Sequence, residues 1–318
     1  MKLKQTLLII ISSVLCLAMY PLYDMALLIM LLITACTAAY ALTGDSTISL
    51  IPFMISLVCA LAFNAVLGTI YITPGILAAV SSLAGFVMGR SIKGKWALQN
   101  VLLYSGGVFL VAIIIAILTV NMYYEIDSIN MFMTWCKEIS YSALTTVSGS
   151  LPAELTEADL KEYIDVMYAY ITTLIPSFLI ITCGLFAYAS FGIARFILKK
   201  NNIILPLLPD RRHLIMSRGS GWIMILVWVL SFLITNDTIG YALSNISVII
   251  SAFFFVCGIS LILYFIEYNI KNLAFKWILR ILFVIALFSF PLLSELLIMV
   301  AIVDSIWNFR RLGFILRQ

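Results

Sequence analysis

The chain has 318 residues, of which 64% are hydrophobic and 11% are charged, and its mean hydropathy is +1.13. A soluble domain is about half apolar and about a quarter charged, so this composition excludes a water-soluble fold. The formal net charge of +4 must be read from where the charges fall, and it does not imply a nucleic-acid partner. The six cysteines are scattered without a CxxC pair, so no zinc site, disulfide framework or cofactor is predicted.

Apolar runs of bilayer length recur along the chain and are separated by short polar or turn segments. This pattern predicts an all-α integral membrane protein with about nine to ten hydrophobic segments. The first segment is expected to be an uncleaved span, since no small-x-small cleavage site follows it. The expected segments lie at 5–20, 22–42, 47–67, 71–89, 97–120, 170–197, 221–236, 239–266, 277–290 and 292–309.

The basic residues predict how these segments are oriented, because Lys and Arg near span ends stay on the cytoplasmic side. With the N-terminus inside, only Lys137 and Lys161 of the 19 basic residues lie outside. We therefore expect both termini in the cytoplasm and the protein in the cell membrane. The segments 277–290 and 292–309 are expected to form a hairpin or re-entrant pair at Pro291, although whether they fully cross stays open.

The segment 121–169 is the one sizeable extramembrane piece, and its acidic residues predict that it faces outward. In its second half, apolar residues recur at helical spacing after a capping pattern at Thr156. We expect an amphipathic helix on the outer surface that runs into the sixth span, with Pro176 marking a kink. Two hypotheses remain open for this piece: an acidic solvated connector, or a lid over a substrate entrance.

Motifs of intramembrane enzymes and nucleotide-binding proteins are missing from the sequence. It contains no HExxH, no P-loop and no dinucleotide fingerprint, and its one histidine, His213, lies in a basic loop. The expectation is therefore a protein that is not an enzyme and holds no metal.

The connection between the third and fourth segments offers a candidate substrate-binding site. Asn64 lies inside an apolar run, and Tyr71, Thr73 and Gly75 lie around the start of the next helix. Exposed N–H groups at such a start favour a polar or anionic solute. The alternative is a tight outer turn in which Asn64 is hydrogen-bonded between helices.

Two further residue sets are singled out by their types and spacing. One is a possible intramembrane charge cluster in the last segment, for which interfacial carboxylates neutralised by nearby arginines are the alternative. Its members are Glu295, Asp304, Arg310 and Arg311. The other is the pair Gly85 and Gly89, whose four-residue spacing lets two helices pack closely.

Three stretches carry a resemblance to a known family: 194–200 (ARFILKK), 205–209 (LPLLP) and 303–311 (VDSIWNFRR). In these stretches the chain resembles the YybS-like family of multi-pass membrane proteins. That family in turn is similar to the substrate-binding S-components of energy-coupling-factor (ECF) transporters. The resemblance implies an S-component-like module at 1–200, formed by the first six spans. A basic cytoplasmic loop at 201–219 and additional transmembrane helices at 220–318 would follow it.

S-components work with a separate transmembrane coupling subunit and ATPases, so the resemblance implies such partners by analogy. From the sequence we expect a transport-related module that binds an unidentified small solute within the lipid bilayer. The alternative hypothesis is a membrane scaffold or regulator without transport activity. A polar pocket among the first six spans favours the first hypothesis, and solid helix packing favours the second.

Overall fold

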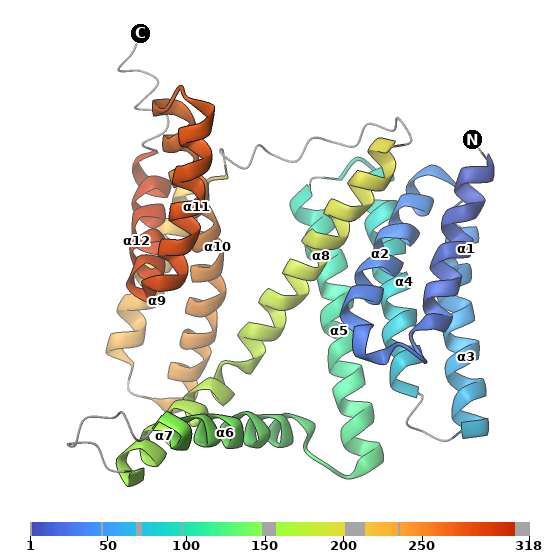
Figure 1. Cartoon of the computed structure of the whole chain (residues 1–318), viewed down its shortest axis with the longest axis horizontal. Helices are drawn as coiled ribbons and strands as arrows, with labels where there is room; N and C mark the ends of the chain where they lie inside the picture. The colour runs from blue at the N-terminus through green and yellow to red at the C-terminus, as the bar shows by residue number, and fades with distance from the viewer. Residues whose placement is uncertain are drawn as a thin grey trace. The chain divides into compact units, whose positions relative to one another are not determined.

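The computed structural model describes residues 2–45, 47–67, 72–96, 98–147, 157–200, 214–234 and 236–308. Every regular element in these ranges is a helix, in agreement with the fold class predicted from the apolar runs (Figure 1). The chain divides into two compact units. Unit 1 comprises Met1–Thr172 and Leu179–Pro206, and unit 2 comprises Thr173–Phe178 and Leu207–Gln318.

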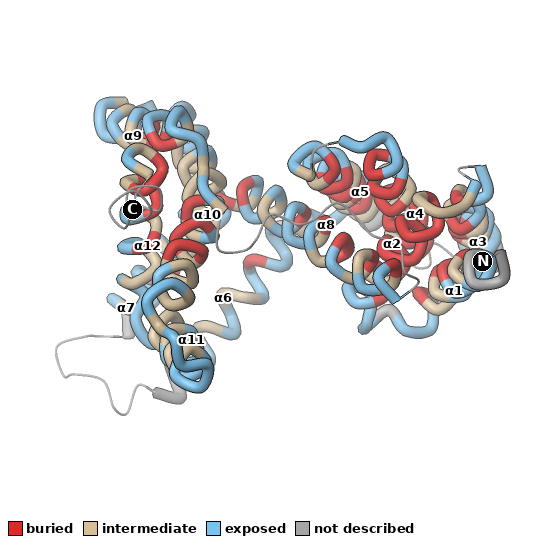
Figure 2. The backbone as a smooth tube through the Cα atoms, turned by 90° about the horizontal axis from the view of Figure 1, so that it is seen from above, coloured by how far each residue is buried: buried red, intermediate tan, exposed pale blue. Residues whose placement is uncertain are grey.

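Unit 1 is built around a bundle of helices that follow one another closely in the chain. The core of this bundle lies on its second and fourth helices, where the side chains of Ile33, Ala39, Ala84 and Met88 are fully buried (Figure 2). Small side chains at many of these positions allow the helices to approach closely. The helices are α1 (Lys2–Ala18), α2 (Ala26–Thr43), α3 (Ile51–Leu67), α4 (Ile72–Lys93) and α5 (Leu98–Tyr124), with the short turns η1 (Tyr23–Met25) and η2 (Ile48–Leu50).

The two ends of this bundle differ in charge. Lys93 Nζ donates a hydrogen bond to the carbonyl oxygen of Gly44, so the C-terminal ends of α4 and α2 lie together. Lys95 is also at this end, which we call the basic end of unit 1. Because short connections join α1 to α2 and α4 to α5, α1 begins and α5 starts at the basic end as well. The opposite end contains Tyr20 and the C-terminus of α5, and we call it the far end.

Beyond α5 the chain turns sharply into a helix that the sequence did not predict. Glu125 adopts a left-handed conformation with φ 51°, which redirects the backbone. Ser128 then donates its N–H to Asn121 Oδ1 at 3.0 Å, and the Asp127 carboxylate accepts two N–H groups of the following turn. These contacts cap the start of α6 (Ser128–Val147) and tie it to the last turn of α5. Figure 1 shows α6 running across the end of α5.

The helix α7 (Glu157–Thr173) packs on α6 through polar side chains. Tyr168 Oη lies 2.7 Å from Ser140 Oγ and donates to the Cys136 carbonyl at 3.0 Å. Asp165 of α7 also contacts two residues of α6, Lys137 and Tyr141. The capping residue Thr156 lies outside the described residues.

The amphipathic helix runs into the sixth span as expected, but the break lies at Leu174, two residues before the predicted kink at Pro176. α7 ends at Thr173, Leu174 is not helical, and α8 (Ile175–Lys200) begins after it. Pro176 lies in the first turn of α8, where its missing N–H breaks no helical hydrogen bond. The proline therefore marks a helix start rather than a kink within a helix.

Unit 2 contains four helices whose starts are fixed by capping residues or proline. Ser217 accepts from Ser220 N–H, Asn236 from Ile239 N–H and Asn272 from Ala274 N–H, while Pro291 occupies the first turn of the last helix. Its buried apolar residues come from the first, second and fourth of these helices. The helices are α9 (Arg218–Leu233), α10 (Asp237–Asn269), α11 (Leu273–Ser289) and α12 (Pro291–Trp307).

The apolar helices fall at the expected segments, but their lengths differ. α2, α4, α5, α8 and α10 are long and apolar enough to cross a membrane. α1 and α3 have 17 residues and α9 has 16, about 25 Å at 1.5 Å per residue, which is short of a hydrocarbon core of about 30 Å. α11 and α12 are bent by 112° at Phe290, so they do not form one straight helix. This geometry fits a broken span or a re-entrant loop.

Candidate functional site

The far end of unit 1 contains a buried tyrosine hydroxyl. Tyr20 follows α1, and its ring packs against Phe63 of α3 with ring centroids 4.4 Å apart. A Cβ atom built on Gly75 would lie 2.6 Å from Tyr20 Oη and would also meet Ala60, so only glycine fits there. Tyr20 Oη is buried and has no hydrogen-bond partner among the described residues. We call Tyr20, Ala60, Phe63 and Gly75 the Tyr20 site.

A buried unpaired hydroxyl is unfavourable, because it has given up its hydrogen bonds to water. Such a group at the end of a helix bundle calls for an explanation, and a hydrogen-bonding ligand is one. The neighbouring Phe63 ring and the Gly75 backbone give the site an apolar wall and a close backbone approach. The Tyr20 hydroxyl is therefore a hydrogen-bonding group that the described residues leave unused.

Hydroxyl and thiol groups continue from the Tyr20 site into the core of the bundle. Ser12 and Thr37 hydrogen-bond across α1 and α2 at 2.8 Å, and Thr34 donates to the Ser81 carbonyl of α4 at 3.0 Å. Cys16 lies 3.6 Å from Ser82, which links α1 to α4. These groups satisfy one another, so they join the three helices. Among the described residues, the buried polar side chains of unit 1 are serines and threonines, which supply hydrogen bonds rather than charge.

The structure brings one of the four predicted substrate-binding residues into the Tyr20 site. Gly75 is buried there, whereas Thr73 is partly buried in the first turn of α4. Asn64 lies on α3, but its side chain is outside the described part of the chain, as is all of Tyr71. Of the four predicted residues, only Gly75 contacts the Tyr20 site, so the predicted binding role of the connection stays a prediction.

Gly85 and Gly89 lie on the face of α4 that packs against α2. A Cβ atom on Gly85 would meet the Thr34 carbonyl oxygen and, at 2.9 Å, the Thr37 Cβ atom. A Cβ atom on Gly89 would lie 2.5 Å from the Ala38 carbonyl oxygen. The two glycines thus sit at a close approach between helices, within unit 1.

The two carboxylates of the predicted charge cluster, Glu295 and Asp304, do not lie together on α12. Asp304 is 1% exposed, whereas Glu295 is exposed to the surroundings of α12. Nine residues apart at about 100° per residue, the two carboxylates point to opposite sides of the helix. Arg310 and Arg311 lie outside the described residues.

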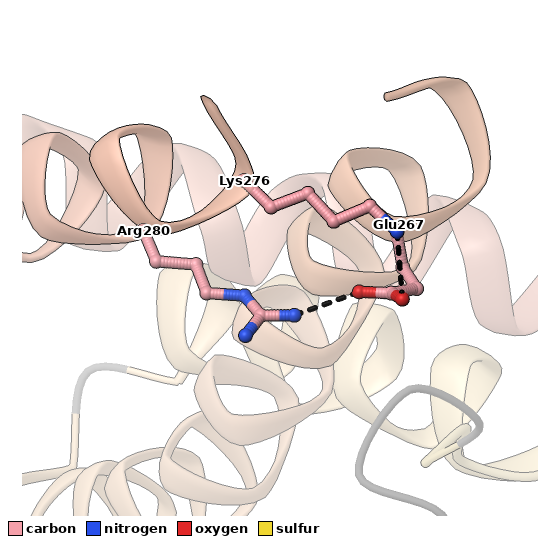
Figure 3. Close-up of polar contacts among 3 residues, drawn as sticks. All are labelled: Glu267, Lys276 and Arg280. Atoms are coloured by element: carbon pink, nitrogen blue, oxygen red, sulfur yellow. Dashed lines mark hydrogen bonds and ion pairs between the residues drawn. The ribbon is translucent and has the colours of Figure 1, made fainter. Parts of the chain in front are cut away.

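A different charge cluster joins α10 to α11 (Figure 3). The Glu267 carboxylate accepts from Lys276 Nζ at 2.8 Å and from Arg280 Nη2 at 2.7 Å. The Arg280 guanidinium also lies 5.3 Å from the centre of the Trp277 ring, at cation–π distance. The three charged side chains are 13–30% exposed, so their ion pairs are partly shielded from water. We call Glu267, Lys276 and Arg280 the α10–α11 charge cluster.

Sequence reasoning missed Tyr20, Phe63 and the α10–α11 charge cluster. Tyr20 adjoins Pro21 at the end of the first apolar segment, and nothing in its spacing reveals that α3 and α4 pack against it. Lys276 and Arg280 are four residues apart, the spacing of one helix face, and follow Glu267 after a short break. That spacing was the signal available for the cluster.

Among the described residues, no three His, Cys, Asp or Glu side chains gather as a metal-binding group. Comparison with known proteins gives one match. A family model described as "Predicted membrane protein (DUF2232)" matches residues 6–305. Neither the curated proteins nor the solved structures contain a match. The family match spans nearly the whole chain and includes helices of both units.

Proposed function

We propose that the chain, which belongs to this family of predicted membrane proteins, is a transport-related module that binds a small solute and has no catalytic step of its own. The observation that carries the proposal is the buried Tyr20 hydroxyl, which lacks a partner among the described residues. A ligand that accepts or donates one hydrogen bond there removes the cost of that unpaired group. The serine and threonine interior of unit 1 favours binding over acid–base chemistry.

The arrangement of charge in unit 1 supports a topology for this module. Lys93 and Lys95 lie at the basic end, and the acidic residues Glu125 and Asp127 lie at the far end. By the positive-inside rule, the basic end lies on the cytoplasmic side of the cell membrane and the Tyr20 site lies on the outer side. Both termini are proposed to be cytoplasmic.

The finer assignment rests on the resemblance to YybS-like proteins and ECF S-components. By that resemblance, unit 1 corresponds to the solute-binding module, and α9–α12 are additional helices. Transport would then require a separate coupling subunit and ATPases, which are partners by analogy only. The solute is identified here only by its chemistry, as a small molecule with a flat or apolar part and a hydrogen-bonding group.

Ligand-dependent thermal stabilisation tests this function. Purified protein is screened against vitamins and metal ions, and any compound that raises the melting temperature is repeated on Tyr20→Phe. We expect Tyr20→Phe to match or exceed the wild type in stability without ligand, because it removes an unpaired buried hydroxyl. It should lose most of the ligand-induced shift. Tyr188→Phe, at an exposed tyrosine of α8, is the matched control and should keep the shift.

A membrane scaffold is the competing function, and the tight contact of α4 with α2 at Gly85 and Gly89 favours it. That contact leaves no room between the two helices at this level. The scaffold is supported instead if no compound stabilises the wild type, or if Tyr20→Phe and the wild type respond equally. Either result would show that the Tyr20 hydroxyl does not bind a solute.

A further inference from the structure

The helix α6 carries an apolar stripe that is exposed among the residues of unit 1 that the structure describes. Met131 is 64% exposed, Phe132 59%, Trp135 57% and Ile139 46%. At about 100° per residue, these four side chains fall within an arc of about 100° on one side of the helix. The rings of Phe132 and Trp135 are neighbours, with centroids 6.2 Å apart. The stripe is therefore a continuous aromatic and aliphatic surface.

The helix α7 does not cover this stripe, because it packs on another side of α6. The α6 residues that contact α7 are Cys136, Lys137, Ser140 and Tyr141. By helical geometry Lys137, Ser140 and Tyr141 lie about 80° or more outside the arc that holds Trp135, and Cys136 contacts α7 through its backbone carbonyl. Asn130 and Thr134 are exposed and lie outside the arc, about 100° and about 60° beyond Met131.

The composition of α6 separates it from the spanning helices. α6 has 20 residues but is not among the helices apolar enough to cross a membrane. It combines an apolar stripe with a polar side that includes Lys137, and this is the pattern of a helix lying in the plane of a bilayer surface. Tryptophan side chains prefer that depth, where the ring meets acyl chains and the indole N–H meets headgroups, and phenylalanine belongs to the apolar face of such helices.

The position of α6 in the chain places it at that depth. α5 is long and apolar enough to span the bilayer, and it ends at Tyr124. Only three residues separate it from α6, and Ser128 is hydrogen-bonded to Asn121 in the last turn of α5. The start of α6 must therefore lie at the bilayer surface where α5 leaves it. Figure 1 shows α6 crossing the end of α5 instead of extending it.

We propose that α6 is a membrane-surface anchor whose stripe of Met131, Phe132, Trp135 and Ile139 inserts into the lipid at the far end of unit 1. The occupant of this surface is the bilayer itself, at the boundary between headgroups and acyl chains. Insertion comes from apolar burial, because the neighbouring residues Glu125, Asp127 and Glu138 are acidic and give no attraction to anionic lipid. The anchor holds the α6–α7 pair against the membrane surface instead of leaving it in solvent.

Fluorescence quenching of labels on the two sides of α6 tests this proposal. The six native cysteines are replaced in the full chain, and single cysteines are introduced by Met131→Cys, Trp135→Cys and Ile139→Cys on the stripe. Asn130→Cys and Thr134→Cys on the polar side are the matched controls. Each protein is labelled with bimane and placed in phosphatidylcholine nanodiscs. Brominated acyl chains then report lipid contact, and aqueous iodide reports water contact.

The expected pattern follows the helix period. Brominated lipid should quench the three stripe labels strongly, and iodide should quench them weakly. At positions 130 and 134, iodide should quench strongly and brominated lipid weakly. Leu118→Cys, on an exposed position of α5, gives the lipid-quenched reference. Equal iodide quenching at all five positions would place the stripe in water and overturn the proposal. Quenching of the stripe by neither agent would mean that protein covers it, which overturns the proposal as well.

Discussion

One added methyl group is enough to test the contact between α2 and α4. Gly85→Ala or Gly89→Ala puts a Cβ atom where the structure has a carbonyl oxygen of α2. Overpacking of this kind lowers the free energy of unfolding by about 1–3 kcal/mol, and the better helix propensity of alanine offsets about 0.5–1 kcal/mol of that loss. We therefore expect a lower melting temperature for either variant in a thermal-shift assay on purified protein.

The controls for this prediction are helical glycines that face open space. A Cβ atom on Gly107 of α5 or on Gly192 of α8 would meet nothing within 4 Å. Gly107→Ala and Gly192→Ala should leave the melting temperature unchanged or raise it slightly, since only the helix propensity changes. If all four variants behave alike, the close approach of α2 and α4 is refuted.

At the level of single residues, sequence spacing predicts some features and leaves others hidden. The four-residue spacing of Gly85 and Gly89 marks a face of one helix, and the structure puts both against α2. No such signal identifies the residues that pack against Tyr20, because Phe63 and Gly75 are distant in the chain and contact it only after three helices pack. Glu295 and Asp304 share a short segment but point to opposite sides of α12, which a count of charges does not reveal.

Among the helices, α11 depends most on one polar contact. It has no buried residue of its own, and Glu267 of α10 binds both Lys276 and Arg280 near its start. Glu267→Gln keeps the shape but removes the charge, and it leaves two partly shielded cations without their counterion. Hydrogen bonds between charged groups contribute about 1.5–3 kcal/mol, and solvent screening reduces this at partly exposed sites. We expect faster hydrogen exchange across α11, measured by mass spectrometry.

The control for the α10–α11 charge cluster is Glu295→Gln on the exposed side of α12. That variant removes the same charge from the same unit without touching the cluster, so α11 should exchange as in the wild type. Unchanged exchange in Glu267→Gln would show that the cluster does not hold α11 to α10.

Contacts between α6 and α7 predict a dependence on pH. Hydrogen bonds from Lys137 and then Tyr141 hold the pKa of Asp165 below its usual range. A lowered folded-state pKa stabilises the packed pair above the unfolded value of about 3.9, and this contribution is lost as the pH falls through the lowered value. The protection of α7 against hydrogen exchange, relative to the intrinsic amide exchange rate at the same pH, should therefore fall on acidification below about pH 4.

Asp165→Asn separates this titration from general acid unfolding. The variant lacks the carboxylate, so the acid-dependent step in α7 should disappear and exchange at pH 7 should already be slightly faster. The increase should be small, because exposed ion pairs contribute little and the Tyr168–Ser140 hydrogen bond remains. An acid step of wild-type size in Asp165→Asn would rule out this carboxylate as its source.

Secondary structure was predicted best where hydropathy alone determines it. The ten apolar helices fall at the expected segments, because burial in lipid demands long apolar runs with satisfied backbone groups. α6 was missed because its apolar residues cover one side only, so the helix as a whole is not apolar enough to cross a membrane. The break was expected at Pro176 and lies two residues earlier, at Leu174, because the proline occupies the first turn of α8.

The whole molecule divides into two compact units of mainly apolar helices. Unit 1 contains the Tyr20 site and the amphipathic helix α6, and unit 2 contains the α10–α11 charge cluster. All of these rest on one claim: the apolar helices cross a bilayer with the basic connections on its cytoplasmic side. Composition does not reveal that α8 contributes residues to both units.

Side-specific cysteine labelling in intact cells and inverted vesicles tests that claim most directly. Single cysteines are introduced into the cysteine-free chain at Lys95, Asp127, Asn272 and Asn308, which all flank helices. A membrane-impermeant maleimide should reach position 127 from outside the cell, and positions 95, 272 and 308 from the cytoplasmic side alone. Labelling of positions 95 and 127 from the same side would contradict the proposed threading of the chain.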